Sequence, residues 1–179
     1  MIDLKNLESS IVAIYKNHYL DVYRFLVCFT GNQNDAEDLT QEVFIRVLKS
    51  LPSFNGENNL KTWIFSIAKH TAVDHYRKKR FYSIFKDGFF KQLESKEKKP
   101  DEEMEMNAMK KMVHESVAKL KPNYRAVVIL RGINEFSIKE TSAILQCSES
   151  KVKVDYHRAL KDLKRKLNMN IEEVLIHAK

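Results

Sequence analysis

Apolar residues recur at three- and four-residue intervals along most of this chain, and that spacing places them on one face of an α-helix. The pattern predicts helices over residues 7–29, 35–51, 60–80, 107–120 and 124–130. Only 4 Gly and 3 Pro occur among the 179 residues, so the composition contains few helix breakers. The chain is therefore predicted to be all-α.

Two loops separate the first three predicted helices. Residues 31–34 (GNQN) and 52–59 (PSFNGENN) are rich in the polar residues and glycine that favour turns. Asn34 is followed three residues later by Glu37, and this spacing predicts that Asn34 caps the second helix.

Charged residues concentrate between the third and fourth helices. Residues 86–104 mix many acidic and basic side chains, which is typical of an exposed, mobile segment. We therefore predict two small helical domains, residues 1–85 and 105–179, joined by this flexible charged linker. An aromatic patch near the junction comprises Phe81, Tyr82, Phe85, Phe89 and Phe90. Docking on the first domain is its favoured interpretation, and contact with a regulator or a membrane is the alternative.

A further pair of helices, joined by a short turn, is predicted between Phe136 and Leu167. Ser137 and Glu140 have the spacing of a capping box, and Ser148 can cap the second helix of the pair. That second helix is strongly basic. A short capped helix, a tight turn and a longer basic helix form the helix-turn-helix plan, in which the second helix enters the DNA major groove.

The distribution of charge agrees with an anionic partner. The chain has a formal net charge of +7, and residues 104–179 carry 15 of its basic residues against 9 acidic ones. Most of the basic excess therefore lies in the part that contains the predicted helix-turn-helix. A solvated basic surface is the alternative interpretation.

Other features argue against several classes of protein. Cys28 and Cys147 are too few for a disulfide framework, and we expect buried thiols in a reducing cytoplasm. No signal peptide is visible, and no apolar run approaches the ~20 residues that span a bilayer. Phosphate-binding glycine loops, nucleophile elbows and metal-ligand spacings are also absent. We therefore expect a cytoplasmic protein that is not an enzyme, with no cofactor, metal or small-molecule substrate.

The order of the predicted elements resembles the extracytoplasmic-function (ECF) group of bacterial RNA polymerase sigma factors. The stretch DAEDLTQEVFIRVL is followed by LKTWIFSIAKHTAVDHYRKKR, then by the charged linker and the basic helix-turn-helix. The resemblance extends from about residue 10 to residue 167. It implies a first domain that binds the polymerase core and opens the promoter −10 region, and a second domain that reads the −35 region.

The resemblance assigns polymerase binding to one face of the second helix. The residues on this face are Asp38, Gln41, Glu42 and Ile45. In the family, this face docks on a basic coiled coil in the clamp region of the polymerase β′ subunit. Exposed carboxylates and an amide can pair with basic side chains and set the register of a partner. A merely solvated polar face is the alternative.

The third helix matches the family's −10 reading helix. The matching residues are His70, Asp74, Arg77 and Lys78. The loop before this helix, with Phe54 and Asn55, corresponds to the loop that traps unpaired bases in the family. Phe54 would then offer a stacking face, and anchoring the loop to the core is an equally good interpretation. Trp63 is predicted to be a core residue because it lies on the apolar stripe.

In the second domain, the residues expected to contact −35 DNA are Ser148, Lys151, Lys153, His157 and Arg158. The first turn of this helix also offers backbone N–H groups to a phosphate. The chain departs from the family's pattern at three positions. Asp155 stands where a basic residue is common, Gln146 replaces the usual turn glycine, and Val154 replaces a small polar residue. These departures affect which DNA sequence is read rather than the function.

The partners implied by the resemblance are RNA polymerase core, promoter DNA and an anti-sigma factor. A stand-alone helix-turn-helix regulator that binds an operator is the competing interpretation. It leaves the first domain without a role, and nothing resembles a dimerisation heptad. A regulator of sigma factors is a third possibility, but the zinc-type Cys/His cluster often seen in such proteins is absent.

Overall fold

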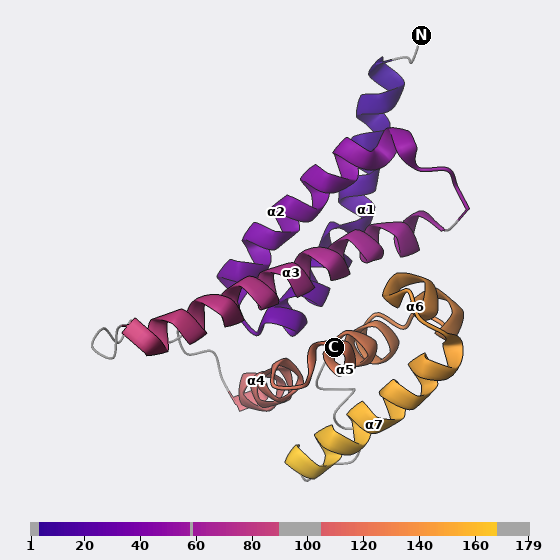
Figure 1. Ribbon diagram of the computed structural model, residues 1–179. Coiled ribbons are helices and arrows are strands. Elements are labelled where there is room, and N and C mark those ends of the chain that lie inside the picture. The colour runs from indigo at the N-terminus through magenta and orange to yellow at the C-terminus, as the bar shows by residue number, and fades with distance from the viewer. Residues whose placement is uncertain (1–3, 58, 90–104, 168–179) are drawn as a thin grey trace.

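The structure is a computed structural model, and it describes residues 4–57, 59–89 and 105–167. Figure 1 shows the arrangement of its helices. The elements are α1 (Leu4–Thr30), α2 (Gln33–Ser50), η1 (Leu51–Ser53), α3 (Leu60–Phe89), α4 (Glu105–Ala118), α5 (Pro122–Val128), η2 (Ile129–Ile133), α6 (Ile138–Leu145) and α7 (Glu149–Leu167). No strand occurs in the described ranges, and the all-helical prediction is confirmed. The predicted linker residues 90–104 lie outside the described residues.

Helices α1, α2 and α3 pack against one another as the first half of the molecule. Gly31 ends α1 in the left-handed conformation with φ of +70°, which glycine adopts without steric cost. Asn32 then caps α2, because its side chain accepts a hydrogen bond from the backbone N–H of Asp35 at 2.9 Å. The prediction that Asn34 is the cap was therefore wrong, and the helix begins two residues earlier than predicted, at Gln33.

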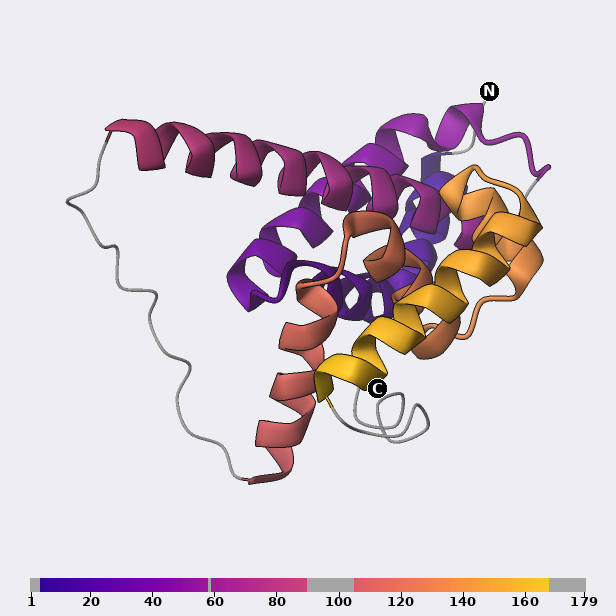
Figure 2. The same cartoon turned by 60° about the horizontal axis from the view of Figure 1, so that its bottom comes forward.

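Helix α3 is the longest element of the described chain, with 30 residues and a length of roughly 45 Å. It continues to Phe89, beyond residue 85 where the first domain was expected to end. Asp35 of α2 holds it in place through His75 and Lys79, at 3.3 and 3.1 Å. The C-terminal end of α3 extends beyond the other helices in both Figure 1 and Figure 2.

The second half of the described chain consists of α4 to α7. Pro122 begins α5, where its missing N–H is not needed. The chain then widens into the π-helix η2, in which the N–H of Asn134 donates to the carbonyl of Ile129 at 2.9 Å. Helix α7 packs against α4, α5 and α6.

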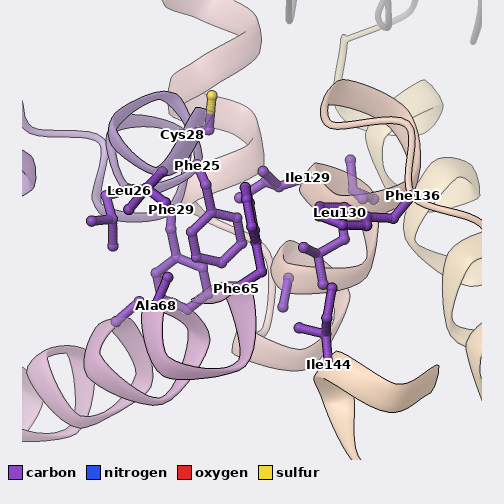
Figure 3. Close-up of a cluster of buried hydrophobic side chains, with 14 of the residues drawn as sticks. Phe25, Leu26, Cys28, Phe29, Phe65, Ala68, Ile129, Leu130, Phe136 and Ile144 are labelled. Atoms are coloured by element: carbon purple, nitrogen blue, oxygen red, sulfur yellow. The ribbon is translucent and has the colours of Figure 1, made fainter. Parts of the chain in front are cut away.

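One hydrophobic core joins the two halves. Figure 3 shows side chains from α1, α3, η2 and α6 gathered in a single cluster. At its centre the ring of Phe65 lies 4.7 Å from that of Phe136, edge to face, and 5.7 Å from that of Phe25. Fully buried aromatic pairs of this geometry are among the strongest apolar contacts. The two halves therefore form a closed body in this structure.

Arg125 of α5 makes a buried polar contact with the first half. Its side chain is buried, and Nη1 donates to the carbonyl of Phe29 at 2.7 Å while Nη2 donates to that of Leu120 at 3.0 Å. The guanidinium carbon also lies 5.0 Å from the ring centres of both Phe29 and Tyr76. Burial lowers the pKa of Arg125 from its ordinary value. Arg125 thus caps the end of α1 from within α5.

Candidate polymerase- and DNA-binding surfaces

The face of α2 predicted to bind polymerase is accessible. Asp38 and Gln41 are exposed, and Ile45 is a large apolar side chain with 52% of its surface exposed. Glu42 forms an ion pair with Arg46 one turn further along the helix. Arg46 was missed in the sequence, although its spacing of four residues from Glu42 is the ordinary signal for such a pair. The face therefore combines the acid Asp38, the amide Gln41 and the apolar Ile45 with Glu42, an acid that is paired with Arg46.

The loop before α3 is held by local contacts. The ring of Phe54 packs on that of Trp63 at 5.0 Å, and both residues are half-buried. This contact corresponds to the anchoring interpretation of Phe54, while part of the ring remains accessible. Asn55 is exposed, and its Oδ1 accepts a hydrogen bond from the N–H of Glu57 at 3.2 Å. Gly56 lies between them with φ of +74°.

The structure brings the four residues predicted to read the −10 region onto one exposed face of α3. His70, Asp74, Arg77 and Lys78 are all exposed. Asp74, Arg77 and Lys78 follow His70 by four, seven and eight residues, so the four side chains project from one side of the helix over about two turns. Lys79, in contrast, turns toward α2 and pairs with Asp35. This face can therefore present an imidazole, a carboxylate and two cations to DNA.

The helix-turn-helix forms as the sequence predicts. The N–H of Glu140 donates to Ser137 Oγ at 3.1 Å, and the N–H of Ser137 donates to Glu140 Oε2 at 2.8 Å. These hydrogen bonds lower the pKa of Glu140. Gln146 adopts the left-handed conformation with φ of 54° in the position where the family has glycine. Ser148 caps α7 by accepting a hydrogen bond from the N–H of Lys151 at 3.2 Å.

The exposed side of α7 carries the predicted −35 contacts. All five predicted residues, Ser148, Lys151, Lys153, His157 and Arg158, are exposed. Asp155 is only 8% exposed, and it accepts a hydrogen bond from Lys151 Nζ at 2.7 Å. The pair raises the pKa of Lys151. Burial and the pairing with Lys151 therefore reduce the negative charge that Asp155 presents on the surface of α7.

Val154 is a surface residue that the sequence prediction did not assign to the reading face. It is exposed on α7, one turn before Arg158. An exposed aliphatic side chain in the major groove can contact the methyl group of thymine. Its spacing of four residues from Arg158 is the signal in the sequence that could have placed Val154 on the same face of α7 as Arg158.

The two candidate DNA-binding faces begin close together. Lys69 precedes His70 on α3, Cys147 precedes Ser148 at the start of α7, and Lys69 contributes to the pKa of the Cys147 thiol. Burial lowers the pKa of the half-buried Lys69 and raises the pKa of the Cys147 thiol. Helix α6, which leads into the turn, packs directly on α3.

Among residues 4–57, 59–89 and 105–167, no group of three or more His, Cys, Asp or Glu side chains is placed to hold a metal ion. None of the helices in these ranges combines the length and apolar character needed to cross a membrane.

Two family models match the chain in the order expected from the sequence. The model of Sigma-70 region 2 matches residues 14–82, and the model of Sigma-70 region 4 matches residues 110–163. The first match covers α2 and the loop before α3, together with most of α1 and α3. The second covers most of α4 and the whole of α5 and α6, and extends into α7.

Similar proteins extend along nearly the whole chain. The ECF RNA polymerase sigma factor SigX of Bacillus subtilis is 36% identical over 174 residues, which cover 94% of this chain and 89% of that protein. The RNA polymerase sigma factor YlaC of the same organism is 32% identical over 169 residues, with 93% and 96% coverage.

Two solved structures share the fold. The sigma factor RpoE of Bartonella quintana, in complex with the anti-sigma factor NepR, aligns with a TM-score of 0.71 at 23% identity, over 93% of this chain and 99% of that one. CnrH, in complex with the cytosolic domain of CnrY, aligns with a TM-score of 0.68 at 19% identity, over 90% and 89%.

Proposed function

The chain belongs to the extracytoplasmic-function group of RNA polymerase sigma factors, and we propose how its parts divide the work of such a factor. It binds RNA polymerase core and directs it to promoters through their −35 and −10 elements, which initiates transcription. Residues 1–85 bind the core and open the −10 region, residues 105–179 bind the −35 element, and residues 86–104 connect them. Both regions are present in one chain and in this order, and that observation carries the proposal.

The polymerase-binding surface in this proposal is the α2 face of Asp38, Gln41, Glu42 and Ile45. Asp38 and Gln41 supply polar contacts, and the exposed Ile45 supplies apolar area at the C-terminal end of the same stripe. Charged groups at the edge of an interface mainly set register and association rate. Because Glu42 pairs with Arg46, we expect Asp38 to attract basic side chains of the polymerase more strongly than Glu42 does.

The DNA-binding surfaces in this proposal lie on α3 with its preceding loop and on α7. Phe54, Asn55, His70, Asp74, Arg77 and Lys78 form the −10 surface. Ser148, Lys151, Lys153, His157 and Arg158 form the −35 surface. Support comes from the exposure of these residues, apart from the half-buried Phe54, and from the cations that each surface offers to phosphates.

The remaining parts of the proposal concern partners and location. RpoE and CnrH were solved with NepR and with the cytosolic domain of CnrY, and we assign an anti-sigma partner to this chain by their likeness in fold. Sigma factors in general are not enzymes, and no catalytic role is proposed for this one. Its place of action is the cytoplasm, where the polymerase works. The stand-alone operator-binding regulator is not favoured, because the first half matches a sigma-factor region.

The test is size-exclusion co-elution with bacterial RNA polymerase core at moderate salt. The wild-type chain is expected to co-elute at one to one. The double variant Asp38→Lys, Glu42→Lys should elute separately, because it reverses both acids of the face. The matched control is Glu57→Lys, Glu115→Lys, which makes the same charge change at exposed acids elsewhere and should still co-elute. Normal co-elution of the first variant would refute the assigned face, and failure of the wild-type chain would refute the proposed function.

A further inference from the structure

The end of α3 carries exposed aromatic side chains that the proposed surfaces do not use. Phe81 is 60% exposed and Tyr82 is 71% exposed, and their rings meet edge to face at 6.5 Å. They lie in the last third of α3, and the C-terminal end of this helix extends beyond the body of the molecule in Figure 2. The favoured prediction that the aromatic patch docks on the first domain is therefore wrong for these two residues. The side chains of Phe85, Phe89 and Phe90 lie outside the described residues.

Phe81 continues the proposed −10 face of α3. The face is formed by His70, Asp74 and Arg77, and Phe81 follows Arg77 by four residues. Residues spaced in this way stand above one another on one side of a helix. At ~1.5 Å per residue, Phe81 lies about 16 Å beyond His70, a distance of roughly five nucleotide steps. Tyr82 points about 100° away around the helix, and its ring contacts that of Phe81 edge to face.

The surroundings of Phe81 are basic. Arg77, Lys78 and Arg80 are exposed, and none of the ion pairs found within the described ranges involves them. Lys79 differs, since Asp35 binds it. Cations that are not committed to acids on the protein can pair with phosphates and release counterions. The basic charge of this helix end therefore favours a nucleic-acid backbone, which is anionic, as its partner over a basic protein surface.

We propose that Phe81 is a stacking platform for an unpaired base of promoter DNA, at the end of the α3 surface that reads the −10 region. This proposal rests on the proposed function, which supplies DNA with unpaired bases. A phenyl ring has no hydrogen-bonding group with which to read base edges in a groove, and its best partner is the face of a base. That face becomes accessible only when the base leaves its pair and its neighbours. A planar ring among cations is the arrangement used by proteins that bind single strands.

The proposal is tested on the full-length chain with fluorescein-labelled DNA of mixed sequence, as a single strand and as a duplex of the same length. Fluorescence anisotropy gives the affinity for each at several salt concentrations. The wild-type chain should prefer the single strand. Phe81→Ala should weaken single-strand binding by about 5- to 150-fold, the range for loss of one stacked base, and change duplex binding less than about twofold. Phe81→Trp should restore single-strand binding.

Two control variants separate stacking from charge. Arg77→Ala should reduce the slope of log affinity against log salt by about 0.7 on the single strand, whereas Phe81→Ala should leave that slope unchanged. Tyr82→Ala, which truncates the neighbouring ring, should have the smaller effect on affinity. Because Phe81 is exposed, its truncation should leave the melting temperature unchanged.

Several results would overturn the proposal. The wild-type chain could bind both probes with equal affinity. Phe81→Ala could lose the same affinity for both probes, or it could lose affinity for neither. Loss of co-elution with polymerase core in Phe81→Ala would instead make this surface a protein contact, and stronger binding of the wild-type chain to anionic vesicles would make it a membrane contact. Core binding by the wild-type chain is measured separately, so failure of stacking leaves the proposed function standing.

Discussion

Replacing Arg125 with methionine tests whether one buried cation holds the two halves together. The side chain is 4% exposed, and it donates hydrogen bonds to Phe29 of α1 and to Leu120 after α4. The carbonyl of Phe29 lies in the last turn of α1, where carbonyls have no partner within the helix, and the carbonyl of Leu120 lies between α4 and α5. Methionine can fill much of the volume and keep contact with the rings of Phe29 and Tyr76, but it cannot donate a hydrogen bond.

The size of the effect follows from the groups left behind. Each buried carbonyl that loses its donor destabilises the fold by roughly 1–3 kcal/mol, so two carbonyls give about 2–6 kcal/mol. Loss of the contacts between the cation and the two rings adds about 1 kcal/mol. Removal of a buried charge offsets part of this, because burial already disfavours the charged form of Arg125. We expect Arg125→Met to lower the free energy of unfolding by about 3 kcal/mol.

The assay combines urea unfolding, followed by the fluorescence of Trp63, with small-angle scattering in the absence of urea. The matched control is Arg131→Met. Arg131 is also a partly buried arginine, but it donates to the carbonyl of Phe136 and lies 5.7 Å from the ring of Tyr156, both within the second half. Arg125→Met should increase the radius of gyration, and Arg131→Met should not. Retention of both stability and compactness in Arg125→Met would refute the reasoning.

Two further predictions concern glycine conformation and pH. Gly31→Ala should destabilise the fold by about 2 kcal/mol and Gly56→Ala by about 1 kcal/mol, since both have positive φ and left-handed backbone strains any residue with a Cβ. The difference arises because a Cβ at Gly31 would lie 3.1 Å from that of Ala118, whereas one at Gly56 would meet nothing within 4 Å; equal urea midpoints would contradict this explanation. Burial, and secondarily the charge of Lys61, lower the pKa of His18. The unfolded chain then binds a proton more readily, so stability should fall as the pH drops below about 6.5 toward the folded pKa. His18→Gln should flatten that dependence of the urea midpoint on pH, and an unchanged slope would show that other groups cause it.

The local structure of the helix-turn-helix could be predicted from the sequence because its signals are local. Ser137, Glu140 and Ser148 satisfy backbone N–H groups within three residues of themselves, so their spacing alone identifies the helix starts. The start of α2 was predicted less well. Asn32 and Asn34 each precede an acid by three residues, and the choice between them depends on Gly31, whose left-handed conformation ends α1.

The packing between the halves could not be predicted from the sequence. Arg125 lies within an apolar stretch, and its acceptor Phe29 is 96 residues away along the chain. No helical periodicity relates positions so far apart. Asp155 illustrates the same limit at shorter range, because its burial depends on how α7 rests on the other helices. The predicted site residues stay predictions, and the structure adds that each of them lies on an accessible or partly accessible face.

The closed body has a consequence for how promoters are recognised. Elements centred at −35 and −10 are about 25 base pairs apart, which is ~85 Å along B-DNA at about 3.4 Å per base pair. In the structure the proposed faces for these elements begin near each other, at Lys69 and at Cys147, because α6, which leads into α7, packs directly on α3. Rigid helices of ~45 Å and ~28 Å that meet in this way cannot place both faces on one straight duplex. We therefore expect the contacts of Phe136 and Arg125 with the first half to break when the chain binds a promoter with the polymerase. Variants that weaken these contacts should lower the free energy needed to separate the two halves. The stability that the closed body loses should then be recovered as tighter binding of the chain and polymerase to promoter DNA.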